Sequence, residues 1–289
     1  MPELIHETVE ANGIRLHAAR CGDGPLMLFL HGFPEYWAMW RPMLEHFGAL
    51  GYRAVAPDLR GYNLSDKPAA VEAYRAKHLM ADVLALAAHY TKDKFVLVAH
   101  DWGGAVAWGV AIAHPQRLAK LVMVNSPHPY IFWRELCNNP AQQQASEYMR
   151  FFRLPKAERV LSENGYARLL GAFADLDEGA RKALVEAWSQ PGALTGGLNY
   201  YRASPMYPPS AEDPGASKLQ LKPEDFMVRV PTLVIWGERD TALLPGCLEG
   251  LDMVVPNLKL VRVPDATHWV ARERTALVIR EIEAFTIGS

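Results

Sequence analysis

The stretch Phe95-Val96-Leu97-Val98-Ala99-His100-Asp101-Trp102-Gly103-Gly104-Ala105-Val106-Ala107-Trp108 joins a strand pattern to a helix pattern within a few residues. Four apolar residues run into Ala99, and Asp101 stands two residues before a pair of glycines. Strand, very tight turn and helix in this order predict a nucleophile elbow, which presents a reactive side chain at its apex. Small residues flank the apex because the strand and helix backbones nearly touch there.

The apex residue is Asp101, in the position where serine is the usual nucleophile. A serine hydroxyl needs a base to remove its proton, whereas a carboxylate with an unperturbed pKa of about 3.9 is already an anion. We therefore expect Asp101 to attack an electrophilic carbon directly and to form an ester of the protein itself. The alternative is that Asp101 only caps the helix N-terminus, a common role of aspartate. Catalytic partners elsewhere in the chain would favour the role of nucleophile.

Length and composition indicate a globular protein. The chain has 289 residues, of which 50% are hydrophobic, and its net charge of −2 gives no bulk attraction for nucleic acid or anionic membranes. Its three cysteines, Cys21, Cys137 and Cys247, form neither a disulfide framework nor a zinc pattern. The first ten residues lack the apolar core of a signal peptide, and we expect a cytoplasmic protein.

Predicted strands and helices alternate along two parts of the chain. The strands are expected at 4–10, 14–20, 26–30, 52–56, 95–99, 118–124, 232–236 and 258–263. An Asn-Gly turn joins the first two as a hairpin, and the later alternation predicts a mostly parallel central sheet with helices on both faces.

The alternation stops between residues 130 and 223, where only helical segments are expected. A Pro- and Ser-rich connection covers 204–223. We therefore predict an α/β core formed by 1–129 and 223–289, with an inserted helical cap domain at 130–222.

Partners for Asp101 are expected beyond the C-terminal ends of later strands, where sites of α/β sheets form. Asp240 follows one such strand and His268 follows the last. The order nucleophile, acid, histidine is the one used in α/β-hydrolases. His268 is expected to be the general base for water, with Asp240 orienting it and stabilising its imidazolium form.

Other residues could compete for these roles. Glu238 and Asp265 are alternative acids, ranked below Asp240, and Asn125 closes another strand without offering a carboxylate. His31 and His100 are expected to be hydrogen-bonded structural residues.

The oxyanion hole is expected to be formed by two backbone N–H groups, those of Phe33 and Trp102. They would stabilise the tetrahedral intermediate formed when water attacks the Asp101 ester. No metal-ligand spacing and no phosphate-binding glycine loop is present in the sequence, so no cofactor and no metal are expected.

The chain resembles α/β-hydrolases of the soluble epoxide hydrolase family over nearly its whole length. The resemblance is carried by His31-Gly32-Phe33-Pro34-Glu35, Pro57-Asp58-Leu59-Arg60-Gly61-Tyr62, His100-Asp101-Trp102-Gly103-Gly104, Gly237-Glu238-Arg239-Asp240 and Thr267-His268-Trp269. Their joint order and spacing are more specific than any one of them.

The resemblance implies two cap tyrosines that donate hydrogen bonds to the epoxide oxygen. Asn199-Tyr200-Tyr201-Arg202 matches the segment carrying one, which assigns it to Tyr201, and Tyr148 matches the other. Adjacent helix residues point about 100° apart, so only one of Tyr200 and Tyr201 can face the site. Tyr130 and Tyr166 are the fallback candidates. The resemblance also implies that Glu35 positions the hydrolytic water and that the Phe33–Pro34 bond is cis.

The expected activity is the conversion of a small hydrophobic epoxide and water to a vicinal diol through an aspartyl ester. A haloalkane-type dehalogenase using the same triad and a non-catalytic ligand-binding homologue are the alternatives. Haloalkane dehalogenases often carry a halide-binding Asn where this chain has Phe33, which favours the epoxide. No nucleic-acid or membrane partner is expected. The oligomeric state stays open, a homodimer included.

Overall fold

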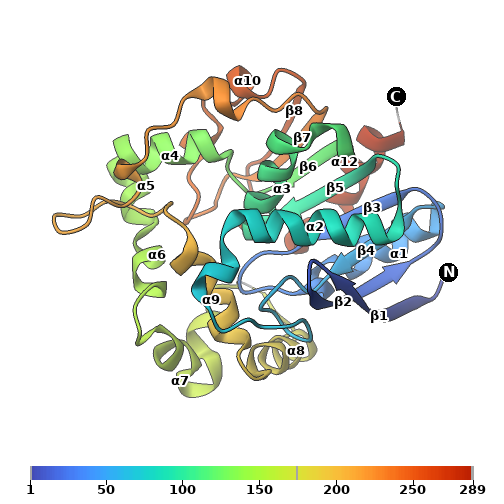
Figure 1. Cartoon of the computed structure of the whole chain (residues 1–289), viewed down its shortest axis with the longest axis horizontal. Coiled ribbons are helices and arrows are strands. Elements are labelled where there is room, and N and C mark those ends of the chain that lie inside the picture. Colours follow the sequence, from blue (N-terminus) through green and yellow to red (C-terminus); the bar gives the residue numbers. More distant parts are fainter. Residues whose placement is uncertain (1, 174, 288–289) are drawn as a thin grey trace.

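The computed structural model of the protein describes residues 2–173 and 175–287. Its eight strands form one sheet in the order β1-β2-β4-β3-β5-β6-β7-β8 (Figure 1). The strands are β1 (Leu4–Ala11), β2 (Ile14–Cys21), β3 (Leu26–Leu30), β4 (Arg53–Pro57), β5 (Phe95–His100), β6 (Leu118–Val124), β7 (Thr232–Gly237) and β8 (Leu258–Val263). These limits agree closely with the strands expected from the sequence.

The sheet is mostly parallel, as predicted. β1 pairs antiparallel with β2 across a turn at Asn12 and Gly13, and β2 pairs antiparallel with β4. All remaining pairs, from β4 through β8, are parallel. β3, β5 and β7 are buried along their whole length, since helices cover both faces of the central strands.

Helices cover both faces of the sheet, which confirms the predicted α/β class. They are α1 (Arg41–Ala49), α2 (Ala76–Tyr90), α3 (Asp101–Ala113), α10 (Leu251–Val254), α11 (Val270–Glu273) and α12 (Thr275–Ile287). Leu79 of α2 and Val106 of α3 belong to one buried cluster, whereas Phe47 of α1 and Val278 of α12 belong to another. Neighbouring residues of one strand, such as Leu97 and Val98, belong to different clusters. Since successive side chains of a strand point to opposite faces, the two clusters lie on opposite sides of the sheet.

The sequence pattern also predicts a helix over 37–50 and a terminal helix over 273–285, and the structure has a helix in each region. The helix expected over 37–50 begins as a 3-10 turn, Trp37–Trp40, and continues as α1 from Arg41, with a proline in its first turn. The helix expected over 273–285 is α12, and the short helix α11 precedes it, separated by Arg274, whose backbone is non-helical with φ −131°.

The segment between β6 and β7 contains helices and no strand within its described residues. These helices are α4 (Pro129–Asn138), α5 (Pro140–Ala145), α6 (Glu147–Phe152), α7 (Ala157–Leu170), α8 (Glu178–Ser189) and α9 (Ala193–Ala203). They gather at one side of the core, beyond one end of the central strands (Figure 1). The stretch expected as a loop, 204–223, contains a 3-10 turn at Gly215–Lys218, and a second turn, Pro223–Phe226, begins where it ends.

None of the helices within the described ranges combines the length and the apolar character needed to cross a bilayer.

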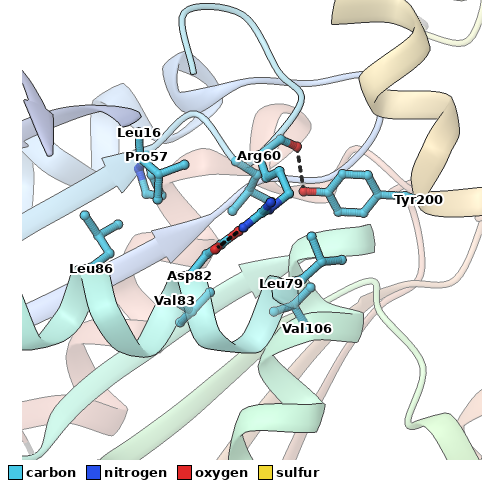
Figure 2. A pocket seen from close by; sticks show the side chains of 10 residues that line it. Leu16, Pro57, Arg60, Leu79, Asp82, Val83, Leu86, Val106 and Tyr200 are labelled. Carbon is cyan, nitrogen blue, oxygen red and sulfur yellow. Dashed lines mark hydrogen bonds and ion pairs between the residues drawn. The ribbon is translucent and has the colours of Figure 1, made fainter. Parts of the chain in front are cut away.

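Helix α9 is docked on the core by direct contact between backbones. A Cβ placed on Gly196 would lie 2.2 Å from the carbonyl oxygen of Gly61, so both helix and loop need glycine here. One turn later, the Tyr200 hydroxyl donates a 2.9 Å hydrogen bond to the Arg60 carbonyl. The Arg60 side chain in turn forms two 2.6 Å bonds to Asp82 of α2 (Figure 2). The core loop that carries Arg60 is thereby fixed between the sheet helices and α9.

We predict that Asp82→Ala lowers the free energy of unfolding by about 3–5 kcal/mol, because it leaves the buried Arg60 guanidinium without its partner. The Arg60 and Asp82 side chains are only 6% and 5% exposed. Chemical denaturation followed by circular dichroism measures the change. Glu45→Ala is the control, since its pair with Arg41 is exposed and should contribute less than about 1 kcal/mol. Equal effects of the two substitutions would contradict the prediction.

Candidate active site

Asp101 lies at a sharp bend between β5 and α3. Its φ is 49°, a left-handed backbone that a non-glycine residue adopts only under strain. The bend brings backbones together, since a Cβ on Gly103 would lie 2.4 Å from the His31 carbonyl oxygen. A Cβ on Gly32 would lie 2.2 Å from Oδ1 of Asp101 itself. The geometry is that of a nucleophile elbow with a carboxylate at its apex.

Two backbone amides point at the Asp101 carboxylate. The Phe33 N–H donates to Oδ1 at 2.8 Å, and the Trp102 amide also hydrogen-bonds the carboxylate. These are the two groups expected to form the oxyanion hole. The peptide bond between Phe33 and Pro34 is cis, as the resemblance implies. Oδ1 is therefore held by the backbone, while Oδ2 is left on the side of the carboxylate that faces His268.

His268 lies between two aspartates. Its Nδ1 is 2.7 Å from Oδ2 of Asp240, and its Nε2 is 3.6 Å from Oδ2 of Asp101. The Asp240 side chain is completely buried, and those of His268 and Asp101 are 13% and 12% exposed. The structure thus brings together the three residues that the sequence analysis selected from three separate strand ends.

The Asp240 carboxylate accepts three hydrogen bonds in addition to its contact with the base. The Ala242 and Leu243 amides donate to Oδ1 at 2.8 and 2.9 Å. Asn125, which the sequence analysis noted only as lacking a carboxylate, donates to Oδ2 at 2.9 Å and to the Gly237 carbonyl at 3.3 Å. Asn125 also accepts from the Gly237 amide, so it ties the end of β6 to the end of β7. Its position directly after a strand was the only available signal for this role.

The electrostatics of the base follow from its two neighbours. Burial disfavours the charged form of His268, but the charges of Asp240 and Asp101 outweigh it and raise its pKa to about 9. Burial also opposes the charge on Asp240, yet His268 and the surrounding hydrogen bonds lower the pKa of that carboxyl. The Asp240–His268 pair is therefore charged at neutral pH.

Asp101 departs from the ordinary pKa that the sequence analysis assumed. Burial raises the pKa of its carboxyl, while His268 and the amides of Phe33 and Trp102 favour the ionised form and limit the rise. The nucleophile is therefore partly desolvated, and protein groups replace the water that would otherwise surround it.

The competing residues are occupied elsewhere. Glu238 forms a 2.9 Å ion pair with Arg262, and Asp265 pairs with Arg274. His31 accepts a 3.0 Å hydrogen bond from the Leu59 amide. His100 hydrogen-bonds the His268 backbone carbonyl at 3.0 Å, and burial lowers its pKa well below the usual range. Both histidines are thus structural, as expected.

Two cavities meet at Asp101. One has a volume of about 360 Å³ and the other of about 370 Å³, and Asp101, Tyr148 and Tyr201 line both. His268 lines the first, together with Phe33 and Trp269 among others. The second is lined mainly by apolar residues of α3, α9 and the chain that follows α9. A molecule bound at Asp101 would therefore have room on both sides.

The two tyrosines named from the resemblance face this junction. Tyr201 is 3% exposed and its ring lies 5.0 Å from that of Trp102 and 6.1 Å from that of Tyr148. Burial, followed by the Asp101 charge, raises the pKa of both phenols well above 10, so both carry their protons. Among the described residues, neither hydroxyl donates to a protein acceptor.

The other tyrosines are engaged differently. The Tyr200 hydroxyl donates to the Arg60 carbonyl, and that of Tyr166 donates to the Trp188 carbonyl at 3.3 Å. Tyr130 packs its ring against Trp133. Tyr166 and Tyr130 do not line either cavity, although Tyr200 borders the second one.

Glu35 is completely buried, and both of its oxygens pair with the Arg272 guanidinium, one of them at 2.8 Å. Arg272 belongs to α11, just after His268, and the sequence analysis did not identify it. Its pairing links the loop that carries Phe33 to the segment that carries the base.

Among the described residues, no group of three or more His, Cys, Asp or Glu side chains could hold a metal ion. The polar groups at the cavity junction are instead a carboxylate, an imidazole, two phenols and two backbone amides. Together they can offer a nucleophile, a base, proton donors and hydrogen bonds to a developing oxyanion.

The fold and this arrangement can be compared with known proteins. A sequence family described as the alpha/beta hydrolase fold matches residues 25–275. The chain is 39% identical to the AB hydrolase superfamily protein YfhM of Bacillus subtilis (strain 168), covering 93% of each. It is 36% identical to epoxide hydrolase 4 of Mus musculus, covering 96% of this chain and 77% of that protein.

Among solved structures, a Bacillus megaterium epoxide hydrolase in complex with an inhibitor superposes with a TM-score of 0.89 and 32% identity. The match covers 96% of this chain and 99% of that one. The chain therefore belongs to the α/β-hydrolase superfamily and, within it, to the soluble epoxide hydrolase family.

Proposed function

We propose that the protein is an epoxide hydrolase that converts an epoxide and water to a vicinal diol through a covalent ester on Asp101. The observation that carries this proposal is the junction of the two cavities, where a carboxylate faces two protonated phenols. Relatives and solved structures named as epoxide hydrolases support the same activity.

In the first step, Oδ2 of Asp101 attacks one epoxide carbon and the carbon–oxygen bond of the ring breaks. The departing oxygen becomes an alkoxide that stays attached to the substrate. Tyr148 and Tyr201 are proposed to hydrogen-bond this oxygen and to supply a proton. Their raised pKa values keep the protons on the phenols until the alkoxide, a stronger base, forms.

In the second step, His268 removes a proton from water, and the resulting hydroxide attacks the carbonyl carbon of the Asp101 ester. The amides of Phe33 and Trp102 stabilise the oxyanion at Oδ1. Collapse of the intermediate breaks the bond between Cγ and the former Oδ2, which leaves as an oxygen of the diol and receives the proton that His268 took from water. Ester formation removes the negative charge 3.6 Å from Nε2 of His268. The pKa of His268 therefore falls after the first step, which favours transfer of its proton to the phenolate left by that step and makes the imidazole available as a base.

Glu35 is proposed to help position the hydrolytic water from the loop that carries Phe33. The charge of Glu35 is balanced by Arg272. Glu35 would therefore act as a hydrogen-bond acceptor for the water and would hold its loop in position by the pair with Arg272.

The substrate is proposed to be hydrophobic, since apolar residues form most of both cavities. A haloalkane would need N–H donors for its departing halide, and two phenols suit an alkoxide better. We propose domain limits of 1–129, 130–222 and 223–289, supported by the unbroken series of helices from α4 to α9. A cytoplasmic location stays a prediction from the sequence.

We predict that His268→Gln completes the first step and then stalls, because the ester forms without a base but cannot be hydrolysed. Intact-protein mass spectrometry after exposure to styrene oxide should show a gain equal to one substrate molecule. The double variant with Asp101→Asn is the control and should gain nothing. Multiple turnovers by His268→Gln would contradict the proposed role of the base.

We predict that Tyr201→Phe lowers kcat by about 10²- to 10⁴-fold, because the alkoxide loses a donor. Tyr200→Phe is the matched control, since it removes a hydroxyl that bonds the Arg60 carbonyl, and we expect a loss within about tenfold. Steady-state rates of diol formation measure both. The reverse ranking would show that Tyr200 is the donor.

We predict that the pKa of His268, about 9 in the free protein, falls in both Asp240→Asn and Asp101→Asn, and falls further in Asp240→Asn. Asp240 contributes more to the elevation than Asp101 does. Nitrogen-15 NMR of the imidazole rings, with His268→Gln for assignment, measures these values.

The same shift has a consequence for stability. Because the folded pKa lies above 6.5, the stabilisation from this pair is fully present below about pH 6.5 and is lost as the pH rises through about 9. This loss should be smaller in Asp240→Asn, where Asp101 still raises the pKa of His268 but Asp240 no longer does. An unchanged His268 titration in that variant would contradict the proposed triad.

A further inference from the structure

Gln142 of α5 reaches from the inserted helices to the loop that follows β7. Its side chain is completely buried. Oε1 accepts a 2.9 Å hydrogen bond from the Leu244 amide, and Nε2 donates a 2.7 Å hydrogen bond to the Ala242 carbonyl. The Gln142 side-chain amide thus bonds the carbonyl before Leu243 and the amide after it, as the backbone of a neighbouring β-strand would.

The backbone held by Gln142 is the same backbone that holds the triad acid. The Ala242 and Leu243 amides donate to Oδ1 of Asp240, whose other oxygen contacts His268. A hydrogen-bonded series therefore runs from an inserted helix to the base. The segment also borders both cavities, because Ala242 lines the first and Leu243 lines the second.

Gln142 has a second contact, toward one of the tyrosines. Its Nε2 also donates a 2.9 Å hydrogen bond to the hydroxyl of Ser146, a buried residue at the junction of α5 and α6. Tyr148 stands two residues further along, in the first turn of α6. The same amide group therefore contacts the segment from which Tyr148 projects.

We propose that Gln142 is a positioning residue that holds the acid Asp240 and the oxygen donor Tyr148 in a fixed relation across the boundary between the inserted helices and the core. The proposal rests on the function proposed above for its link to turnover. Gln142 touches neither the nucleophile nor the base and acts through the residues it holds. Only a side chain with both a donor and an acceptor can bond a carbonyl and an amide at once.

Gln142→Met tests the proposal, because methionine has a similar shape and offers neither hydrogen bond. Gln143→Met is the matched control: among the residues that the structure describes, the Gln143 side chain bonds the Leu136 and Cys137 carbonyls alone, both within the inserted helices. The first readout is the pKa of His268 in the free protein, by nitrogen-15 NMR. That pKa depends on Asp240, Asp101 and Glu273, and His100 lies against the ring.

We expect the His268 pKa to fall from about 9 toward its ordinary value in Gln142→Met and to stay at about 9 in Gln143→Met. This readout needs no turnover, so it tests Gln142 even if epoxides prove not to be substrates. An unchanged pKa in Gln142→Met, or an equal fall in both variants, would overturn the proposal.

The second readout is the division of the effect between kcat and KM for an epoxide. We expect Gln142→Met to lower kcat by about 10- to 100-fold with little change in KM, because a small displacement of the acid and the donor slows both chemical steps. Gln142→Glu retains the acceptor for the Leu244 amide, so its kcat should lie between those of the wild type and Gln142→Met. This variant replaces Gln142→Met as the test if Gln142→Met does not fold. An increase in KM alone, or wild-type kinetics in either Gln142 variant, would count against the assignment.

Discussion

The site depends on one buried carboxylate held at a strained bend. Asp101 has a left-handed backbone, and burial alone would favour its neutral form. Two amides and one imidazole replace the lost water. The small residues around the bend follow from the same constraint, since a side chain on Gly32 or Gly103 would occupy the place of Asp101 or of the adjoining backbone. Strain of this kind persists only where the surrounding structure is rigid.

The charges of His268 and Asp240 depend on each other and on the groups around them. Asp240 keeps the imidazole charged in the free protein, and the Asp240 charge is itself supported by Asn125 and two backbone amides. Because Asp101 and Asp240 lie on opposite sides of one ring, a change of charge on either is felt by His268. In the proposed reaction, forming the Asp101 ester removes one of the two nearby charges that raise the pKa of His268, so the loss of its proton becomes easier when a base is needed.

Local patterns in the sequence were sufficient to predict the sheet and to select three residues, Asp101, Asp240 and His268, that the structure brings together. The central strands β3, β5 and β7 are mostly apolar. Residues that follow β5, β7 and β8 meet at one edge of the sheet because parallel strands end together. The pairing of Asn125 with Asp240 and of Arg272 with Glu35 could not be predicted in the same way. Each joins residues more than one hundred positions apart, and nothing in hydrophobic periodicity specifies which buried polar groups become partners. The division of the helix at 37–50 was missed because the apolar spacing continues across it.

The register of α9 determines which of two adjacent tyrosines, Tyr200 or Tyr201, lies toward Asp101. Tyr200 and Tyr201 are adjacent, so their side chains point about 100° apart and a small rotation of the helix would exchange them. Two contacts prevent that rotation: the close approach of Gly196 to Gly61, and the hydrogen bond from Tyr200 to the Arg60 carbonyl. Arg60 is fixed in turn by Asp82 in the core (Figure 2). Because the Tyr200 hydroxyl is bonded to the Arg60 carbonyl, the adjacent Tyr201 side chain is oriented toward the cavity that Asp101 lines. The contacts of Tyr200 therefore determine the orientation of the proposed donor.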